Sequence, residues 1–147
     1  MKHRIEDDAK LAMKSGDKAR LAVLRLMLSE IKRIEIDSRQ PLDDDGVVDV
    51  LGKMAKQRRE SIKQFADAGR VDLQEKESFE LEVITGYMPQ PLSEVELHAL
   101  IDQAIAHIGA TSIKDMSKVM AEIKTQARGS VDLSIASRIV KTKLMSV

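Results

Sequence analysis

The chain contains no cysteine and no tryptophan, and its aromatic residues are limited to Phe65, Phe79 and Tyr87. The lack of cysteine excludes disulfides, thiolate metal sites and cysteine nucleophiles. With aromatics at 2%, the core must be built from Leu, Ile, Val, Met and Ala, which favours packed helices over a β-sandwich. No apolar run approaches the roughly 18 residues needed to cross a bilayer.

Charge is balanced overall but segregated along the chain. The net charge is zero and the pI is about 6.8, which argues against a general nucleic-acid coat, whose domains usually have a pI above about 9. Residues 53–70 carry six bases against two acids, residues 72–96 seven acids against one base, and residues 114–143 seven bases against three acids. The charged N-terminal segment lacks the apolar stretch of a secretory signal, so we expect a cytoplasmic protein with no membrane partner.

Apolar residues recur every three or four positions, and no segment alternates as a strand does. This spacing predicts an all-α protein of two packed helical lobes, about four helices in residues 1–90 and a three-helix bundle in residues 91–147. Pro89 and Pro91 mark a stiff connector between the lobes. We expect helix N-caps at Asp17, Ser93 and Asp132. Left-handed helix ends are expected at Gly16, Gly69, Gly86, Gly109 and Gly129.

The most informative segment is the basic helix predicted to end near Asp67, because Arg58 interrupts its apolar stripe. An arginine in that position must reach water or meet a fixed partner. The partner is either a carboxylate of the following acidic helix or, alternatively, an RNA phosphate. The neighbouring Lys56, Arg59 and Lys63, with Arg70 after the helix, form either an ordinary solvated face or a phosphate-binding surface.

A second basic set includes Lys118, Lys124 and Arg128 near the expected starts of the last two helices, where lysines beside helix N-termini can hold phosphates. His3, His98 and His107 are isolated from one another and from paired carboxylates. The chain also lacks a G-x-S-x-G elbow and a glycine-rich phosphate loop. We therefore expect no metal site, no cofactor and no catalytic site.

Several short motifs stand in a recognisable order. They are Lys18-x-Arg20-x4-Arg25, Lys56-Gln57-Arg58-x2-Ser61-x3-Phe65, Gly69-Arg70-x-Asp72-Leu73, Glu77, Glu80, Tyr87-Met88-Pro89, Leu92-Ser93 and Asp115-Met116-x-Lys118-Val119-Met120. Together they resemble the YqeY family of small bacterial proteins, and the resemblance covers essentially the whole chain. That family is similar to the C-terminal tail domain of the B subunit of the tRNA-dependent amidotransferase (GatB), a carbon–nitrogen ligase with glutamine as amido-N-donor.

The resemblance implies two packed helical lobes and a tRNA-binding accessory module without its own catalytic site. Lys118 lies where the tail domain has an Ala-Lys pair, with Ser117 in place of the small residue. Near the end, Gly129-Ser130-Val131-Asp132-Leu133 departs from the family's Gly-Arg-Ala-Asp-Gly. The alternative is a protein-interaction module that docks on a synthetase or an amidotransferase, through an exposed patch at Met116 and Met120. An amidotransferase-like enzyme is the third reading, which no catalytic motif supports.

Overall fold

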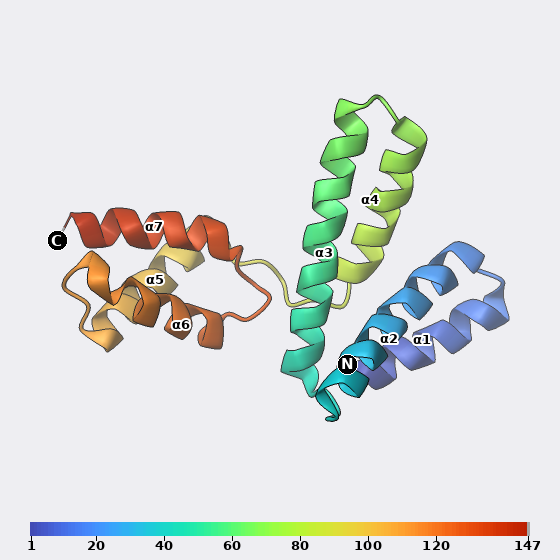
Figure 1. The fold of residues 1–147 in the computed structure, drawn as a ribbon, viewed down its shortest axis with the longest axis horizontal. Helices are drawn as coiled ribbons and strands as arrows, with labels where there is room; N and C mark the ends of the chain where they lie inside the picture. The colour runs from blue at the N-terminus through green and yellow to red at the C-terminus, as the bar shows by residue number, and fades with distance from the viewer. Residues whose placement is uncertain (147) are drawn as a thin grey trace. The chain divides into compact units, whose positions relative to one another are not determined.

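The computed structural model describes residues 1–146, and these residues form an all-α protein with no strand (Figure 1). The chain divides into two compact units, Met1–Met88 and Pro89–Val147. Within the described residues, no helix combines the length and apolarity that crossing a membrane requires. The bounds of the helices are α1 Lys2–Ser15, α2 Lys18–Ser38, α3 Asp44–Asp67, α4 Val71–Thr85, α5 Glu94–Ile108, the short 3-10 helix η1 Ile113–Asp115, α6 Met116–Gln126 and α7 Leu133–Met145.

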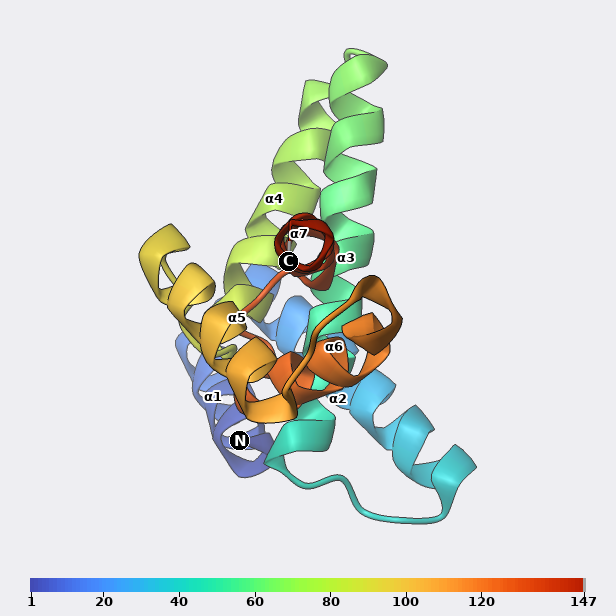
Figure 2. The same cartoon turned by 90° about the vertical axis from the view of Figure 1, so that its left-hand side faces the viewer.

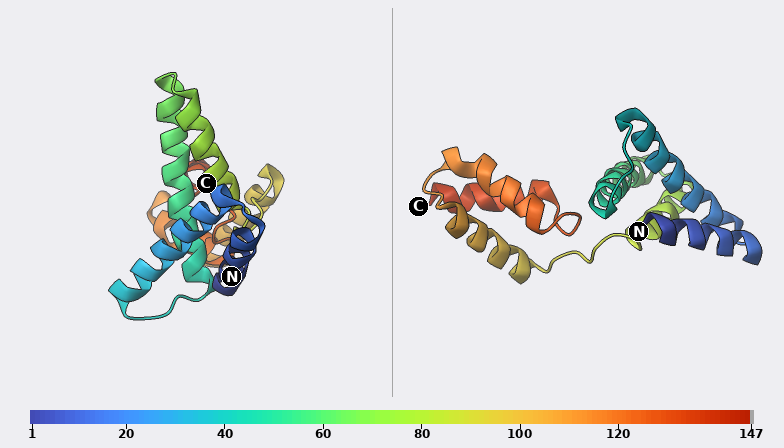
Figure 3. Two further views of the ribbon diagram at one scale, coloured as in Figure 1. Left: turned by 90° about the vertical axis from the view of Figure 1, so that its right-hand side faces the viewer. Right: turned by 90° about the horizontal axis from the view of Figure 1, so that it is seen from below.

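The first unit consists of two antiparallel helix pairs, α1 with α2 and α3 with α4 (Figures 1 and 3). Its core is almost wholly aliphatic, as the composition predicts. The largest fully buried side chains in this unit are Ile5, Leu24, Met27, Ile31, Leu51 and Ile84. Burying each such side chain contributes roughly 1.5–3 kcal/mol relative to leaving it in water. The aromatic residue of this core is Tyr87, which is 3% exposed.

The second unit is built from α5, α6 and α7 around a smaller core (Figures 1 and 2). Ile101, Val119, Ile123 and Val140 are fully buried there, one or two from each helix. Met116 and Met120 pack against this core, so the predicted exposed patch does not form at these two positions. Exposed apolar side chains of the second unit are Val95, Ile113, Leu133, Ile135 and Met145.

Capping side chains fix the helix starts at the expected positions. Asp17 accepts a hydrogen bond from the Arg20 N–H, and Asp132 accepts one from the Ser134 N–H. Ser93 and Glu96 form the reciprocal capping box at the start of α5. These contacts satisfy backbone donors that have no partner within the helix.

The expectation at Gly86 is wrong, because its φ is −61° and lies in the right-handed region. The chain continues through another turn after α4, in which the Tyr87 N–H donates to the Ile84 carbonyl at 3.1 Å and the Met88 N–H donates to the Thr85 carbonyl at 3.1 Å. This turn carries the Tyr87 side chain into the core. The left-handed conformation occurs instead at Gly16, Gly69, Gly109 and Gly129.

Arg39, at the end of α2, is a non-glycine residue in the left-handed region, with φ 56° and ψ 31°. A side chain in this conformation costs about 1–2 kcal/mol. We expect Arg39→Gly to raise the free energy of unfolding by about 0.5–1 kcal/mol, since relief of the strain is partly offset by the greater freedom of glycine in the unfolded chain. Urea unfolding followed by the fluorescence of Tyr87, the one tyrosine in a chain without tryptophan, measures it.

Arg39→Ala is the matched control, because it removes the guanidinium and keeps the strained backbone. We expect it to unfold at the urea concentration of the parent. A gain in stability from Arg39→Ala equal to that from Arg39→Gly would assign the effect to the lost charge and contradict the explanation by strain.

Candidate nucleic-acid interface

Arg58 lies between two carboxylates of the following helix. Its Nε donates to Glu80 Oε2 at 2.7 Å and lies 3.3 Å from Glu77 Oε2. The side chains are 19%, 11% and 21% exposed for Arg58, Glu80 and Glu77. Glu77 Oε2 is buried and accepts no hydrogen bond, so Glu80 is the main partner and Glu77 interacts by charge alone. The intramolecular alternative for Arg58 is therefore the one that the structure shows.

The rest of the basic helix faces outward. Lys56, Arg59 and Lys63 on α3 are exposed, and none of the three forms an ion pair with another described residue. Their spacing of three and four residues places them along one strip, which extends about 10 Å at 1.5 Å per residue. The acidic helix α4 thus neutralises Arg58 and leaves the neighbouring cations available to solvent or to a ligand.

The other predicted site residues are more dispersed. Arg70 is exposed, with its Nε 3.5 Å from Asp72 Oδ1. Lys118 and Lys124 are exposed on α6, but six residues apart they point about 120° away from each other around the helix. Arg128 is half-buried in the turn after α6 and already has an interaction partner. The strip on α3 is therefore the closest grouping of the predicted cations along one helix face.

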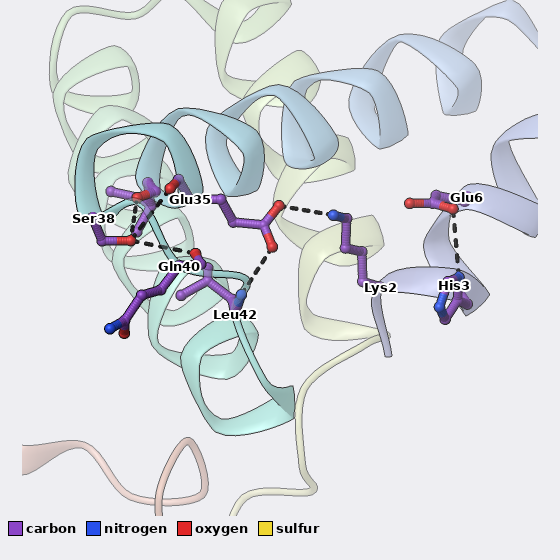
Figure 4. Close-up of polar contacts among 8 residues, drawn as sticks. Lys2, His3, Glu6, Glu35, Ser38, Gln40 and Leu42 are labelled. Atoms are coloured by element: carbon purple, nitrogen blue, oxygen red, sulfur yellow. Dashed lines mark hydrogen bonds and ion pairs between the residues drawn. The ribbon is translucent and has the colours of Figure 1, made fainter.

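A groove of about 660 Å³ near the end of α2 is a feature that the sequence did not suggest. Lys2 and Glu35 lie along it, and Figure 4 shows how the Glu35 carboxylate links two segments. Glu35 Oε1 accepts from Lys2 Nζ at 2.7 Å, and its Oε2 accepts from the Leu42 N–H at 2.8 Å. Both oxygens are occupied, so this carboxylate fastens α1 and the loop before α3 to α2. No local sequence motif predicts the contact between Lys2 and Glu35, which are 33 positions apart.

The hydrogen bonds at Glu35 shift two acid–base equilibria. The bond from Lys2, followed by the bond from the Leu42 N–H, holds the pKa of Glu35 below its ordinary value. The same bond to Glu35 raises the pKa of Lys2. Each shift favours the charged form, which keeps the pair ionised at neutral pH.

One known protein family matches nearly the whole chain. Residues 2–144 match the family model described as Yqey-like protein. The chain belongs to the YqeY family. The match extends over both units, from the start of α1 to the last turn of α7.

Relatives of this YqeY-family chain include fungal proteins named "Altered inheritance of mitochondria protein 41, mitochondrial". The protein of Eremothecium gossypii is 39% identical over 105 residues, which cover 70% of this chain and 57% of the relative. The protein of Lachancea thermotolerans is 36% identical over 107 residues, covering 71% and 57%, and that of Kluyveromyces lactis is 34% identical over 129 residues, covering 87% and 67%. The chain thus spans little more than half the length of the first two. Their names place these relatives in mitochondria, whereas a cytoplasmic location for this chain stays a prediction.

Replacing Arg58 tests how strongly the ion pair stabilises the first unit. We expect Arg58→Met to lower the free energy of unfolding by roughly 1–3 kcal/mol, because it leaves Glu77 and Glu80 largely buried without a cation; their partial exposure keeps the loss below that of a fully buried pair. Urea unfolding followed by Tyr87 fluorescence measures the change.

Arg59→Met, one residue along the same helix, is the matched control and should change stability by less than about 0.5 kcal/mol. Adding Glu80→Gln to Arg58→Met should recover part of the loss, since it removes one uncompensated charge. Equal stabilities of the Arg58→Met and Arg59→Met variants would show that the pair does not stabilise the fold.

Glu35→Gln should destabilise the first unit at neutral pH and have progressively less effect in acid. Folding lowers the pKa of Glu35, so its contribution is complete above the ordinary glutamate pKa of about 4.3 and is lost as the pH falls through the lower pKa of the folded state. Urea midpoints at several pH values between about 7 and 2 measure the difference from the parent. Glu75→Gln, on the exposed side of α4, is the control. A difference between parent and Glu35→Gln that is independent of pH would refute the assignment.

Proposed function

We propose that the protein is a tRNA-binding accessory module without a catalytic site of its own, serving a tRNA-dependent carbon–nitrogen ligase. The observation that carries the proposal is the strip of Lys56, Arg59 and Lys63, which is exposed and free of ion pairs among the described residues. A strip of about 10 Å is long enough to contact two or three successive phosphates of one nucleic-acid strand.

Phosphate contacts position an RNA without reading its sequence, which suits an accessory role. Membership of the YqeY family and the resemblance to the amidotransferase tail support tRNA as the RNA class. A net charge of zero supports a local face rather than attraction by the whole molecule.

Binding to total tRNA across about 50–200 mM salt tests the proposal. The triple variant Lys56→Gln/Arg59→Gln/Lys63→Gln should weaken binding by about 10-fold or more at low salt and make the salt dependence shallower by two to three counterions, because each lost phosphate contact removes nearly one released ion. The Lys118→Gln variant, measured in parallel, tests the cations of α6.

The triple variant Lys10→Gln/Lys14→Gln/Lys18→Gln is the control, because it removes the same charge from exposed positions elsewhere in the first unit. It should leave the affinity within about threefold, since attraction by net charge alone is weak and screened. Equal losses of tRNA affinity in the two triple variants would show that the interaction depends on net charge and not on the strip. No binding by the parent at about 50 mM salt would refute tRNA binding.

The exposed apolar side chains of the second unit favour a second candidate, docking on a synthetase or an amidotransferase. Val95 is 80% exposed and Met145 67% exposed, so docking on a partner would remove apolar surface from water that folding leaves exposed. Mixing the protein with purified amidotransferase tests this candidate. A complex that forms with the parent and is lost with the Met145→Gln variant, together with no binding of tRNA, would favour docking over RNA binding.

A further inference from the structure

Two of the three aromatic residues of the chain lie at one small cavity of the first unit. The cavity has a volume of about 220 Å³, and Phe79 and Tyr87 line it together with Arg4 and Arg20. These residues come from α1, α2, α4 and the turn after α4. In a chain with 2% aromatics, two aromatic side chains beside two guanidiniums form an unusual concentration of groups that bind planar anions.

Tyr87 organises the inner wall of the cavity. Its hydroxyl donates to the Asp8 carboxylate and accepts from Arg20 Nη2 at 3.2 Å. The Arg4 guanidinium carbon lies 4.7 Å above the centre of the Tyr87 ring, a cation–π contact. Burial, reinforced by the bond to Asp8, raises the pKa of Tyr87, so the phenol keeps its proton at neutral pH and goes on donating to Asp8.

The two arginines are held in place but not neutralised. Arg20 contacts the tyrosine hydroxyl through one nitrogen, and Arg4 contacts the tyrosine ring. Neither forms an ion pair with another described residue, although the Asp8 carboxylate shares the Tyr87 hydroxyl with Arg20. Because a guanidinium carries five N–H donors, each arginine has donors left for an anion such as a phosphate.

The remaining walls are apolar at one side and acidic at the other. Phe79 is 39% exposed, so its ring is accessible beside the buried Val83. Glu82, one turn along α4, lines the same cavity with an exposed carboxylate that can only accept hydrogen bonds when ionised. A carboxylate repels a bare phosphate but matches the amino group of a nucleobase.

We propose that this cavity binds a single nucleotide, with the base against Phe79, its amino group towards Glu82, and the phosphate at Arg4 and Arg20. The volume accommodates a base and leaves the phosphate at the rim. This inference deepens the proposed function, on which an RNA source for the nucleotide rests; the same chemistry would also take a free mononucleotide. The selectivity follows from Glu82, because adenine, guanine and cytosine carry amino donors and uracil has none.

Titration of the full chain with AMP, followed by calorimetry or NMR, tests the site. We expect AMP to bind saturably. Adenosine, which lacks the phosphate, and ribose 5-phosphate, which lacks the base, should each bind about 10-fold more weakly than AMP. UMP should bind several-fold more weakly than AMP or CMP, and Glu82→Gln should reduce this preference.

Variants separate the contributions of the two sides of the cavity. Phe79→Leu keeps apolar volume and removes the ring face, and Arg4→Gln removes a charge without touching the Tyr87 hydroxyl; each should weaken AMP binding by about 5- to 10-fold. Arg25→Gln, an exposed arginine of α2 outside the cavity, should leave it within about twofold. Far-UV circular dichroism of each variant checks that the fold is intact. No saturable binding of AMP, or equal affinities in the Phe79→Leu and Arg25→Gln variants, would overturn the assignment.

The source of the nucleotide is resolved by comparing AMP with a short single-stranded RNA that ends in adenosine. A single-stranded RNA bound at least about 10-fold more tightly than AMP would assign the site to an RNA end, and equal affinities would assign it to free nucleotides. AMP binding without tRNA binding would refute the proposed function and leave the cavity assignment supported. Binding of tRNA through the strip on α3, with no binding of AMP or of the short RNA, would refute the cavity assignment alone.

Discussion

The structure of the first unit depends on one charged contact, the pairing of Arg58 with Glu80 and Glu77. A helix with an arginine on its apolar stripe can bury that stripe only if the charge meets a partner, because an unpaired buried cation is costly. The acidic helix α4 supplies two carboxylates, so α3 can keep Arg58 on the face that continues from its buried residues at positions 47–55. At 100° per residue, Lys56 and Lys63 then lie roughly opposite Arg58. The internal pair and the exposed strip are therefore consequences of a single rotation of α3.

Features that obey local rules could be predicted from the sequence. The caps at Asp17, Ser93 and Asp132 require only a polar side chain and the N–H groups two or three residues later. The partner of Arg58 could also be predicted, since the link between α3 and α4 is only three residues long and forces the acidic helix back along the basic one. Gly86 shows the limit of such rules. Its turn is set by the burial of Tyr87, which a glycine after a helical pattern does not reveal.

The contacts that could not be predicted join residues far apart in the chain. Tyr87 meets Asp8 and Arg20 across 79 and 67 residues, and their positions follow from how the two helix pairs pack. In the sequence, Arg20 and Tyr87 belong to separate motifs, and no pattern connects either of them with Arg4. A binding role for these three residues can be inferred only from their convergence around one cavity.

The two candidate surfaces of the first unit would respond differently to salt, and this difference bears on how a neutral protein can hold RNA. The strip on α3 consists of exposed charges, whose attraction for phosphates weakens steeply as salt rises. In the cavity, the phosphate at Arg4 and Arg20 would also be sensitive to salt, but the base stacked on Phe79 gains mainly from contact and loss of water, which salt affects far less. With a net charge of zero, the molecule has no general attraction to retain a polyanion between encounters. The stacking of a base on Phe79 would therefore set the lifetime of a complex that the strip helps to form.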